Sequence, residues 1–478
     1  MIVGELRHGQ LVIIDRLKET VRLSEDFEET GELGVAACDR ALDCLKRFGE
    51  RIRDIDAANV RAAGTSTFRR AKSNRIFFKE AEEALGHPID IISGREEARL
   101  IYMGVTHSTP PCEGSRLVLD IGGGSTELIL GQADKPHSLE SLNMGCVIMT
   151  ERFFPDGKIS RSAFEAARLA ARLMIRPVKA FFRDLSIEEV IGASGTILAT
   201  QKVARQAGLI EAELTLDAVQ RLIEKHCEFD RIESVEFDGL SERRAEVWAG
   251  GLVILVELMT ALRIDRLRTS EGALREGLLY ESLGRLQHKD ARERSVQALA
   301  LRYNVDSDQA KRVATTAAEL LGQCESHWNL SSPLVNKVLR WSAHLHEIGL
   351  DISHDRFEQH GAYIVENADL PGFPLAEQHF LAFLISNQRR HMKMRISSAL
   401  PNSWCTSAER LAIILRLAVL LNRSRSRNPL PRIDLEVAAQ SIRIRFEDDW
   451  LQDNPLTGAD LERETGYLAE AGYELSAR

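Results

Sequence analysis

The chain has 478 residues, of which 44% are hydrophobic and 28% are charged, and its formal net charge at pH 7 is -9. This length is too great for one hydrophobic core, so two to four domains are expected, and the composition is that of a soluble globular protein. The acidic balance argues against a general nucleic-acid-binding protein, which would carry a basic excess to neutralise phosphates.

The cysteines and the apolar runs exclude two further classes of protein. The seven cysteines are scattered singly, without a Cys-x-x-Cys pair, which disfavours a disulfide framework and a zinc ribbon. No charged segment followed by an apolar stretch opens the chain, and apolar runs such as 250–259 are too short to cross a bilayer. The sequence therefore predicts a cytoplasmic protein without a membrane span.

The first hundred residues alternate between strand and helix patterns. The opening residues predict a hairpin that turns at His8-Gly9-Gln10, and Ala36 to Ile52 have the apolar spacing of a helix. VRAAGTSTFRR (60–70) predicts a short strand ending in a polar turn. HPIDIISGREEARLIYMGV (87–105) predicts a strand, a Ser-Gly turn and a helix. This alternation is typical of an α/β fold.

The same plan then restarts in the middle of the chain. Strand, turn and helix patterns follow in LVLDIGGGSTELILG (117–131), the charged segment Ser160 to Lys179, VIGASGTILAT (190–200) and LRTSEGALREGLLYESL (267–283). Two such runs predict two related α/β domains that meet at a cleft. Residues 291–421 have mostly helical spacing, and 433–446 alternate like strands, which predicts a small appended sheet.

The triple-glycine turn is the strongest chemical signal. Gly122 to Gly124 leave backbone N–H groups that no side chain screens, and such a patch suits an anion. Asp120 ends the preceding strand and Glu127 follows the turn. Because these carboxylates would repel phosphate unless a divalent cation bridged them, the pattern favours Mg²⁺. The alternative interpretation is an ordinary glycine-rich hairpin.

A second turn of small residues, GASGT (192–196), also follows an apolar strand. Small residues are common in such loops, so this turn alone indicates little. Ligands of open α/β sheets bind beyond the carboxyl ends of the strands. Two turns of this kind therefore strengthen the prediction of a ligand site.

Five motifs resemble one known family. ISGREEARLIYMGV, LVLDIGGGSTELILG, MGCV, GASGT and SEGALREGLLY occur in the order found in the exopolyphosphatase/guanosine pentaphosphate phosphatase family, and the likeness continues through LHEIGL and DLPGF. This family belongs to the sugar kinase, Hsp70 and actin superfamily. The chain is most similar to the exopolyphosphatases, and the resemblance extends over nearly the whole chain.

The resemblance implies an α/β fold class with two ribonuclease-H-like (actin-like ATPase) domains, then an all-α HD-like domain and a small α+β appendage. The implied bounds are 1–100 for the first ribonuclease-H-like domain, 101–285 for the second, 286–425 for the HD-like domain and 426–478 for the C-terminal subdomain. It also implies a homodimer.

The implied activity is hydrolysis of the terminal phosphoanhydride of inorganic polyphosphate, which releases orthophosphate. Two alternatives stay open: a guanosine pentaphosphate phosphatase, and a polyphosphate or nucleotide sensor without turnover. The triple-glycine turn and SEGALREG favour the exopolyphosphatase. A sugar kinase or actin-like ATPase is disfavoured, because Glu97 in ISGREEAR has no evident role in those proteins.

The family's site residues carry over onto matching positions. Glu97 matches the catalytic carboxylate that orients and deprotonates the attacking water, with Glu96 as its rival; a solvated Glu-Glu pair favoured by the helix dipole is the structural alternative. Asp120 and Glu127 match the carboxylates associated with Mg²⁺. The expected phosphate-binding residues are Arg69, Gly122, Gly123, Gly124 and Ser125, with Gly192, Ser194, Gly195 and Thr196 closing the opposite wall. For Arg69, a surface arginine in a loop is an equally good interpretation.

The chain departs from the family at its N-terminus. Family members begin with a strand that ends in an Asp-Leu-Gly-Ser-Asn-Ser-type phosphate turn, whereas Met1-Ile2-Val3 resembles the strand after that turn. Three explanations compete: a true start upstream, a degenerate inactive homologue, or another segment in place of the strand. Because the remaining site motifs are intact, we expect a start upstream.

The helical region raises two further hypotheses. His346-Glu347 stands where HD phosphohydrolases have a metal-binding His-Asp pair, and a metal-free structural role is favoured here. RRHMKMR (389–395) and NRSRSR (422–427) are local basic clusters, for which a solvated helix end and a flexible loop are the alternatives. The first cluster predicts a polyphosphate track made of Arg389, Arg390, Lys393 and Arg395.

Overall fold

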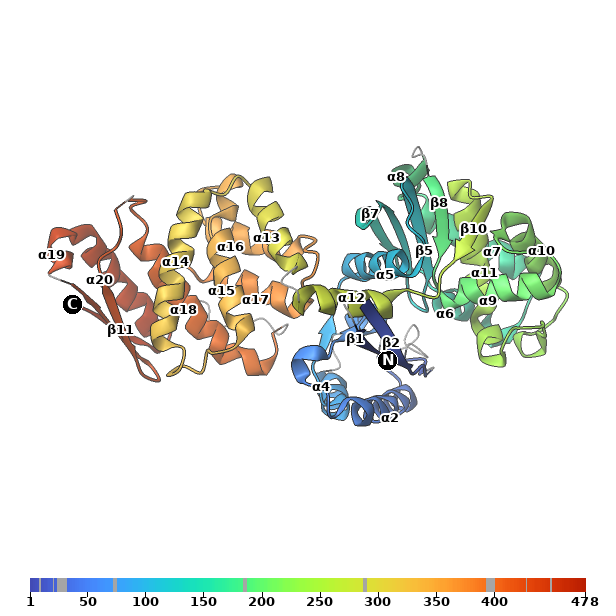
Figure 1. The fold of residues 1–478 in the computed structure, drawn as a ribbon, viewed down its shortest axis with the longest axis horizontal. Coiled ribbons are helices and arrows are strands. Elements are labelled where there is room, and N and C mark those ends of the chain that lie inside the picture. Colours follow the sequence, from blue (N-terminus) through green and yellow to red (C-terminus); the bar gives the residue numbers. More distant parts are fainter. Residues whose placement is uncertain are drawn as a thin grey trace. The chain divides into compact units, whose positions relative to one another are not determined.

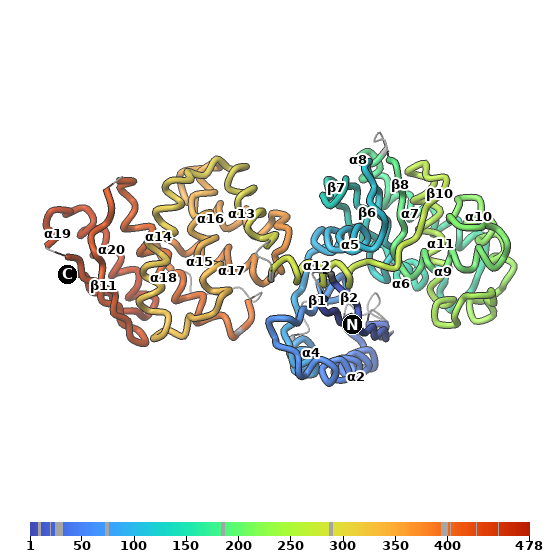
Figure 2. Tube along the Cα trace, viewed as in Figure 1, coloured from blue at the N-terminus to red at the C-terminus, as the bar shows by residue number. Residues whose placement is uncertain are grey.

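The computed structural model describes residues 1–7, 10–19, 21–23, 32–71, 75–183, 187–286, 290–392, 400–426, 428–447 and 449–478. The chain divides into two compact units, an N-terminal unit of residues 1–289 and a C-terminal unit of residues 290–478 (Figures 1 and 2). The division falls close to the predicted boundary at residue 285. The finer division of each unit into domains stays a prediction.

The N-terminal unit begins with the predicted hairpin, although His8 and Gly9 of its turn lie outside the described residues. Its strands and helices up to residue 108 are β1 (Ile2–Arg7), β2 (Gln10–Arg16), α2 (Val35–Ile52), β3 (Ala62–Gly64), α3 (Ser66–Arg70), α4 (Arg75–Leu85), β4 (Ile89–Ile91) and α5 (Gly94–Ser108), with the 3-10 turn η1 (Ala57–Asn59) before β3. β1 pairs antiparallel with β2, and β3 pairs parallel with β4.

The short helix α3 corrects one prediction. A polar turn was expected after β3, but the backbone closes a helical turn there, because the N–H of Arg69 donates to the carbonyl of Thr65 at 2.9 Å. By contrast, the predicted Ser-Gly turn before α5 is confirmed. Ser93 is the N-cap of α5, and its hydroxyl accepts a hydrogen bond from the N–H of Glu96 at 3.1 Å.

A six-stranded mixed sheet forms the centre of the N-terminal unit. Its strands are β5 (Ser115–Ile121), β6 (Thr126–Gln132), β7 (Lys135–Leu142), β8 (Ile187–Gly192), β9 (Leu214–Thr215) and β10 (Arg266–Thr269), in the spatial order β7-β6-β5-β8-β10-β9. β5, β8 and β10 are parallel neighbours, with Leu119 opposite Gly192 and Gly192 opposite Thr269. The turns after these three strands therefore emerge side by side at one edge of the sheet.

Helices cover both faces of this sheet. They are α5, α6 (Cys146–Phe153), α7 (Arg161–Ile175), α8 (Lys179–Arg183), α9 (Gly195–Gln206), α10 (Leu216–His226), α11 (Glu242–Leu262) and α12 (Leu274–Leu286), with η2 (Pro155–Gly157) and η3 (Ile232–Ser234). Along β5, Leu117 and Leu119 pack into the core formed with α6, α7 and α9 to α11, whereas Val118 packs against α5. This alternation buries both faces and confirms the predicted α/β class.

The apolar run at 250–259 belongs to a longer helix than expected. α11 is long and apolar enough to cross a membrane by length and composition alone, but 78% of its most apolar window is buried inside the unit. A buried core helix passes the same test, so α11 is weak evidence for a span. Among the described residues it is the one helix of this kind.

The C-terminal unit consists of helices followed by a small sheet, as the spacing predicts. Its elements are α13 (Ala291–Arg302), α14 (Ser307–Cys324), α15 (Pro333–Leu345), η4 (Ile348–Asp351), α16 (Phe357–Asn367), α17 (Leu375–Ser386), η5 (Asn402–Trp404), α18 (Cys405–Leu421), β11 (Ile433–Val437), β12 (Ser441–Phe446), α19 (Trp450–Asp453), α20 (Pro455–Glu470) and β13 (Glu474–Ala477). The strands lie in the order β11-β12-β13. Leu435, Ile442 and Ile444 of this sheet share one core with the helices, so helices and sheet form a single packed body.

Candidate active site

The glycine turn lies between β5 and β6, and the first residues of helix α6 form hydrogen bonds with it. The N–H groups of Cys146 and Val147 donate to the carbonyls of Gly122 and Gly123 at 2.8 and 3.0 Å. A Cβ on Gly145 would come within 2.2 Å of the Gly123 carbonyl oxygen, so only glycine allows this close approach. The N–H groups of Gly123 and Gly124 donate to no acceptor among the described residues, as an anion site requires.

Two carboxylates face each other at the base of this turn. Asp120 on β5 is directly opposite Glu127 on β6, and the Ser141 hydroxyl donates to Glu127 Oε1 at 2.9 Å. Burial, with the nearby Glu97 charge, raises the pKa of Asp120 to about 7. Burial, Glu97 and Asp120 raise the pKa of Glu127 well above its usual value. Like charges directly opposite on neighbouring strands destabilise a sheet, so this pair calls for a cation.

Glu97 is the third carboxylate, and it comes from the first turn of α5. It is 7% exposed, and Arg69 Nη1 donates both to its Oε2 at 2.9 Å and to the carbonyl of Ile92 at 2.8 Å. Burial raises the pKa of Glu97, while the charge and hydrogen bond of Arg69 and a hydrogen bond with Thr65 oppose this rise. The structure therefore joins Arg69 and Glu97 directly, and Arg69 is a partly buried partner rather than a surface arginine.

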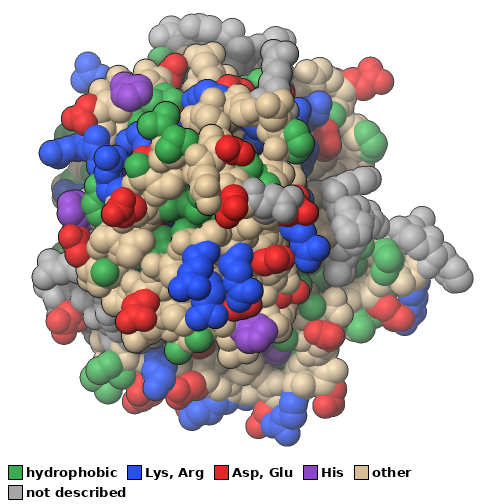
Figure 3. Space-filling model, turned by 90° about the vertical axis from the view of Figure 1, so that its left-hand side faces the viewer, with side chains coloured by type: hydrophobic (Ala, Val, Ile, Leu, Met, Phe, Trp, Pro, Cys, Tyr) green, Lys and Arg blue, Asp and Glu red, His purple; other side chains and the backbone are tan. Residues whose placement is uncertain are grey.

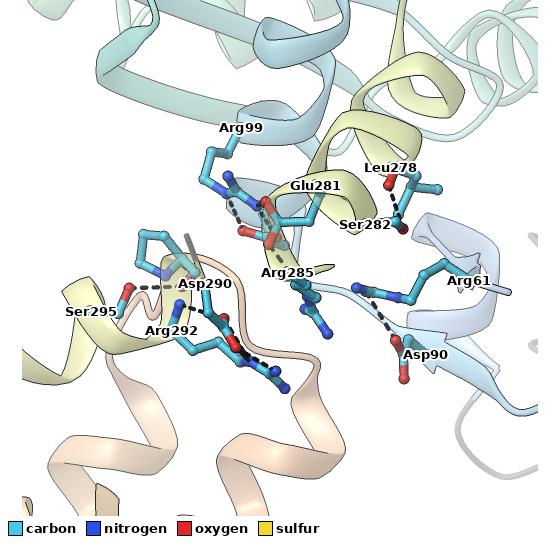
Figure 4. A network of polar contacts seen from close by, with 12 residues as sticks. Arg61, Asp90, Arg99, Leu278, Glu281, Ser282, Arg285, Asp290, Arg292 and Ser295 are labelled. Atoms are coloured by element: carbon cyan, nitrogen blue, oxygen red, sulfur yellow. Dashed lines mark hydrogen bonds and ion pairs between the residues drawn. The ribbon is translucent and has the colours of Figure 1, made fainter. Parts of the chain in front are cut away.

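Glu96, unlike Glu97, belongs to a buried cluster of ion pairs. Arg99 donates to both oxygens of Glu96, each at 2.8 Å, and to Glu281 of α12 at 2.9 Å, and all three side chains are buried (Figure 4). This ion-pair cluster fastens α5 to α12. The geometry therefore favours Glu97 over Glu96 as the carboxylate available for chemistry.

The helix α3 and the start of α5 line the side of the site that faces the glycine turn. A Cβ on Gly124 would lie 3.0 Å from the Ser66 hydroxyl oxygen, and one on Gly94 would lie 2.7 Å from the Ser141 hydroxyl oxygen and 3.6 Å from Arg69 Nη2. These short separations bring segments 65–70, 93–97 and 120–127 around one place. The predicted residues Glu97, Arg69, Asp120, Glu127 and the glycine turn thus belong to one site.

The second turn, with Gly192, Ser194, Gly195 and Thr196, lies beside the glycine turn, because β8 is the immediate parallel neighbour of β5. The two turns therefore follow equivalent strands at one edge of the sheet, and the role of the second turn in phosphate binding stays a prediction. The N–H of Ala193 donates to the carbonyl of Leu119 at 2.9 Å. Ser194 caps α9 by accepting from the N–H of Ile197 at 3.2 Å. The first turn of α9 therefore begins at the same edge of the sheet as the glycine turn.

Basic residues gather near this second turn. A Cβ on Gly195 would come within 2.6 Å of Arg244 Nη2, which places the Arg244 guanidinium against the turn. Burial lowers the pKa of Lys18, and the charges of Arg244 and Arg275 lower it further. Arg275 stands in the motif SEGALREGLLY, whereas Lys18 and Arg244 come from separate segments with no motif, so the sequence did not indicate these two.

The hypotheses on the helical region have mixed outcomes. Arg389 and Arg390 lie in the C-terminal unit, whereas Lys393 and Arg395 fall outside the described residues, so the track stays a prediction.

His346 is buried, its Nδ1 donates to the Ala343 carbonyl at 2.7 Å, and Glu347 pairs with Arg425. Among the described residues no three His, Cys, Asp or Glu side chains form a metal-binding group, and the role of His346-Glu347 stays a prediction.

Solved structures share the fold of this chain. A crystal structure of the Aquifex aeolicus member of the Ppx/GppA family aligns with a TM-score of 0.50 at 25% identity, over 60% of this chain and 94% of that one. An exopolyphosphatase from Cytophaga hutchinsonii aligns with a TM-score of 0.53 at 23% identity, over 59% and 93%. With its doubly covered sheet and glycine turn, the chain is thus an α/β protein of the actin-like ATPase class.

Sequence comparison narrows this class to one family. The Ppx/GppA phosphatase family model matches residues 2–286, and the model of Ppx/GppA phosphatase domain III matches 291–465. The chain belongs to the Ppx/GppA phosphatase family. A relative from Vibrio cholerae named guanosine-5'-triphosphate,3'-diphosphate pyrophosphatase is 38% identical over all of this chain and 95% of its own length. One of the same name from Aeromonas hydrophila is 37% identical over 99% and 95%.

Proposed function

We propose that this protein removes the 5'-terminal phosphate of guanosine pentaphosphate, giving guanosine tetraphosphate and orthophosphate. The full-length match to relatives of that name supports this activity over the exopolyphosphatase that the sequence motifs first favoured. Within the site, the observation that carries the proposal is the Glu97–Arg69 pair facing the glycine turn. Guanosine nucleotides are cytoplasmic metabolites, so we expect the protein to act there, as a homodimer.

The terminal phosphate fits the donors at the glycine turn. The N–H groups of Gly123 and Gly124, which have no acceptor among the described residues, would bind its oxygens, and Arg69 would hold a further oxygen. Fixing the phosphoryl group in this way aligns the bond to be broken with the attacking water. The remaining phosphates of the substrate would meet the cations Lys18, Arg244 and Arg275.

Glu97 is the base in this proposal. Its carboxylate would accept a proton from the attacking water while the water oxygen forms a bond to phosphorus and the phosphoanhydride bond breaks. Burial raises the pKa of Glu97 above its usual value, which makes the carboxylate a stronger proton acceptor. Arg69 keeps Glu97 ionised and holds its orientation through the 2.9 Å hydrogen bond.

Asp120 and Glu127 fit a Mg²⁺ ion. Both present hard oxygen ligands, no described basic side chain forms an ion pair with either, and the raised pKa of each reports an uncompensated charge. Mg²⁺ typically binds through one or two protein carboxylates together with water and substrate phosphates, so two carboxylates suffice. Such an ion would neutralise charge on the phosphates as the bond breaks.

The decisive experiment compares substrates on one preparation. We expect Mg²⁺-dependent orthophosphate release from guanosine pentaphosphate with a higher kcat/KM than from long-chain inorganic polyphosphate, and its near loss in Glu97→Gln. Faster release from polyphosphate would instead establish an exopolyphosphatase. Tight binding of both compounds without turnover would establish a sensor, and full activity in EDTA would exclude the metal.

A further inference from the structure

The C-terminal unit contains a cavity of about 340 Å³. Its lining comes from α18 and α20, from the residues that follow α15, α17 and α18, and from the first turns of α14 and α16. This volume lies within the range of small-molecule sites, which is roughly 300 to 1,000 Å³. The cavity belongs wholly to the C-terminal unit and contains none of the residues of the proposed phosphatase site.

Positive charge dominates the cavity lining. Against three acidic side chains, Glu347, Asp460 and Glu464, the described lining contains six arginines: Arg389, Arg390, Arg416, Arg423, Arg425 and Arg463. The two basic clusters recognised in the sequence thus converge on one place, because the ends of α17 and α18 lie against each other. On the face of the molecule shown in Figure 3, basic and acidic side chains are interspersed instead.

The arginines differ in how far protein partners already satisfy them. Arg416 is buried and donates to Glu464 and to the carbonyls of Asn387 and Arg390, so its role is structural. Arg425 pairs with Asp306 and Glu347. Arg389 makes no ion pair or hydrogen bond with the described residues and lies over the Phe357 ring, 5.0 Å from its centroid. Burial lowers the pKa of Arg389, the Glu358 charge opposes this shift, and the charges of Arg390 and Arg423 lower the pKa further.

The lining of the same cavity includes two buried acceptors without a donor among the described residues. His346 Nδ1 donates to the Ala343 carbonyl, so Nε2 carries the lone pair; it makes no hydrogen bond with the described residues and lies 3.9 Å from Glu347 Oε1. Gln388 Nε2 donates to the carbonyls of His346 and Ile385 at 2.6 and 3.1 Å, which fixes its Oε1 as a second acceptor with no donor among the described residues. Each side chain is 1% exposed. Buried polar atoms are nearly always satisfied, so each of these two requires an N–H or O–H donor, from an ordered water or from a ligand.

We propose that this cavity is a second ligand site that binds a phosphorylated nucleoside. Its phosphates would contact Arg389, Arg390 and Arg423, while base or ribose N–H and O–H groups would donate to His346 Nε2 and Gln388 Oε1. Phe357, Leu350 and Tyr467 supply apolar and aromatic walls for the base. An inorganic phosphate chain is made almost entirely of acceptors, so it would leave both buried acceptors unsatisfied.

The test uses the full chain and identifies the binding site from the peptides that carry a covalent label. The protein is photolabelled with 8-azidoguanosine triphosphate, and labelled peptides are mapped by mass spectrometry. We expect label in residues 341–360 or 455–470, and we expect Arg389→Met to weaken this labelling about ten- to a hundred-fold, as loss of a charge-assisted contact does. The matched control is Arg443→Met, an exposed arginine of β12 that pairs with Glu436 and does not line the cavity.

Several results would overturn the proposal. Label absent from the C-terminal unit, or equal in Arg389→Met and Arg443→Met, would exclude the site. If inorganic tripolyphosphate reduced the labelling as strongly as GTP does, the site would not recognise the nucleoside, and this part of the proposal would be wrong. Should Arg389→Met melt at a lower temperature than the parent, Arg423→Met replaces it, because Asp460 then keeps Arg463 as a partner. A failure of the proposed phosphatase activity leaves this test intact, because the label is read in the C-terminal unit.

Discussion

Asp120 offers a quantitative test of the proposed metal site through the dependence of stability on pH. In the folded chain its pKa is raised from 3.8 to about 7 by burial and by Glu97. The folded state therefore keeps a proton that the unfolded state releases. Without metal, this stabilising contribution is complete below about pH 4 and is lost as the pH rises to about 7.

The shift in pKa sets the size of the effect. Roughly three pKa units correspond to about 4 kcal/mol, and partial solvent access of Asp120 reduces the expected loss to about 2 to 4 kcal/mol between pH 4 and pH 8. Asp120→Asn keeps the shape and removes the charge, so in EDTA at pH 8 the variant should be more stable than the parent. Mg²⁺ should stabilise the parent at pH 8 and stabilise the variant much less.

Hydrogen exchange followed by mass spectrometry on β5 and β6 peptides is the appropriate assay, because it measures the stability of the N-terminal unit separately from that of the C-terminal unit. Asp134→Asn, which changes an exposed side chain in the turn between β6 and β7, is the control and should have no effect. If the parent were equally protected at pH 5 and pH 8 in EDTA, or if Asp120→Asn were the less stable at pH 8, the buried-charge argument would fail.

Four further substitutions separate the roles of neighbouring groups. Glu97→Gln should lower kcat by about 10² to 10⁴-fold with substrate affinity retained; Glu96→Gln should instead cost about 1 to 3 kcal/mol of stability and leave kcat of the folded protein unchanged. Arg69→Lys loses the planar fork that spans Glu97 and phosphate, so kcat/KM should fall about ten- to a hundred-fold; an unchanged value would remove Arg69 from the site. Gly145→Ala should destabilise the chain by about 1 to 3 kcal/mol and reduce turnover. Gly458→Ala, which meets no atom within 4 Å, is its control, and equal melting temperatures would refute the close approach.

Much of the fold could be predicted from local patterns. The apolar spacing, the Ser93 cap and the glycine turn each depend on residues a few positions apart, and the structure agrees with them. Glu97, Asp120 and Glu127 were recognised because motifs carried them. That the 192–196 turn lies directly beside the glycine turn could not be predicted, because local sequence does not tell which strands are neighbours in a sheet.

The remaining site residues depend on contacts between distant segments. Lys18 and Arg244 stand in unrelated stretches of sequence, and each alone is an ordinary basic residue; only Arg275 stands in a recognised motif. In the same way, nothing in the sequence indicated that Arg389 and Arg390 would line one cavity with Arg423 and Arg425. Such groupings depend on how helices pack against one another. The spacing of residues within a single helix does not predict this packing.

The apolar helix α11 also bears on how the chain is made. Its principal packing partners are α6, α7, α8, α9, α10 and β5, all of which precede it in the sequence. During synthesis these segments leave the ribosome first, and domains fold as units from the N-terminal side. When α11 emerges, its binding surface already exists, so its apolar side chains spend little time in water or near a membrane-insertion machinery. The order of elements along the chain thus protects the most apolar segment of the N-terminal unit from aggregation.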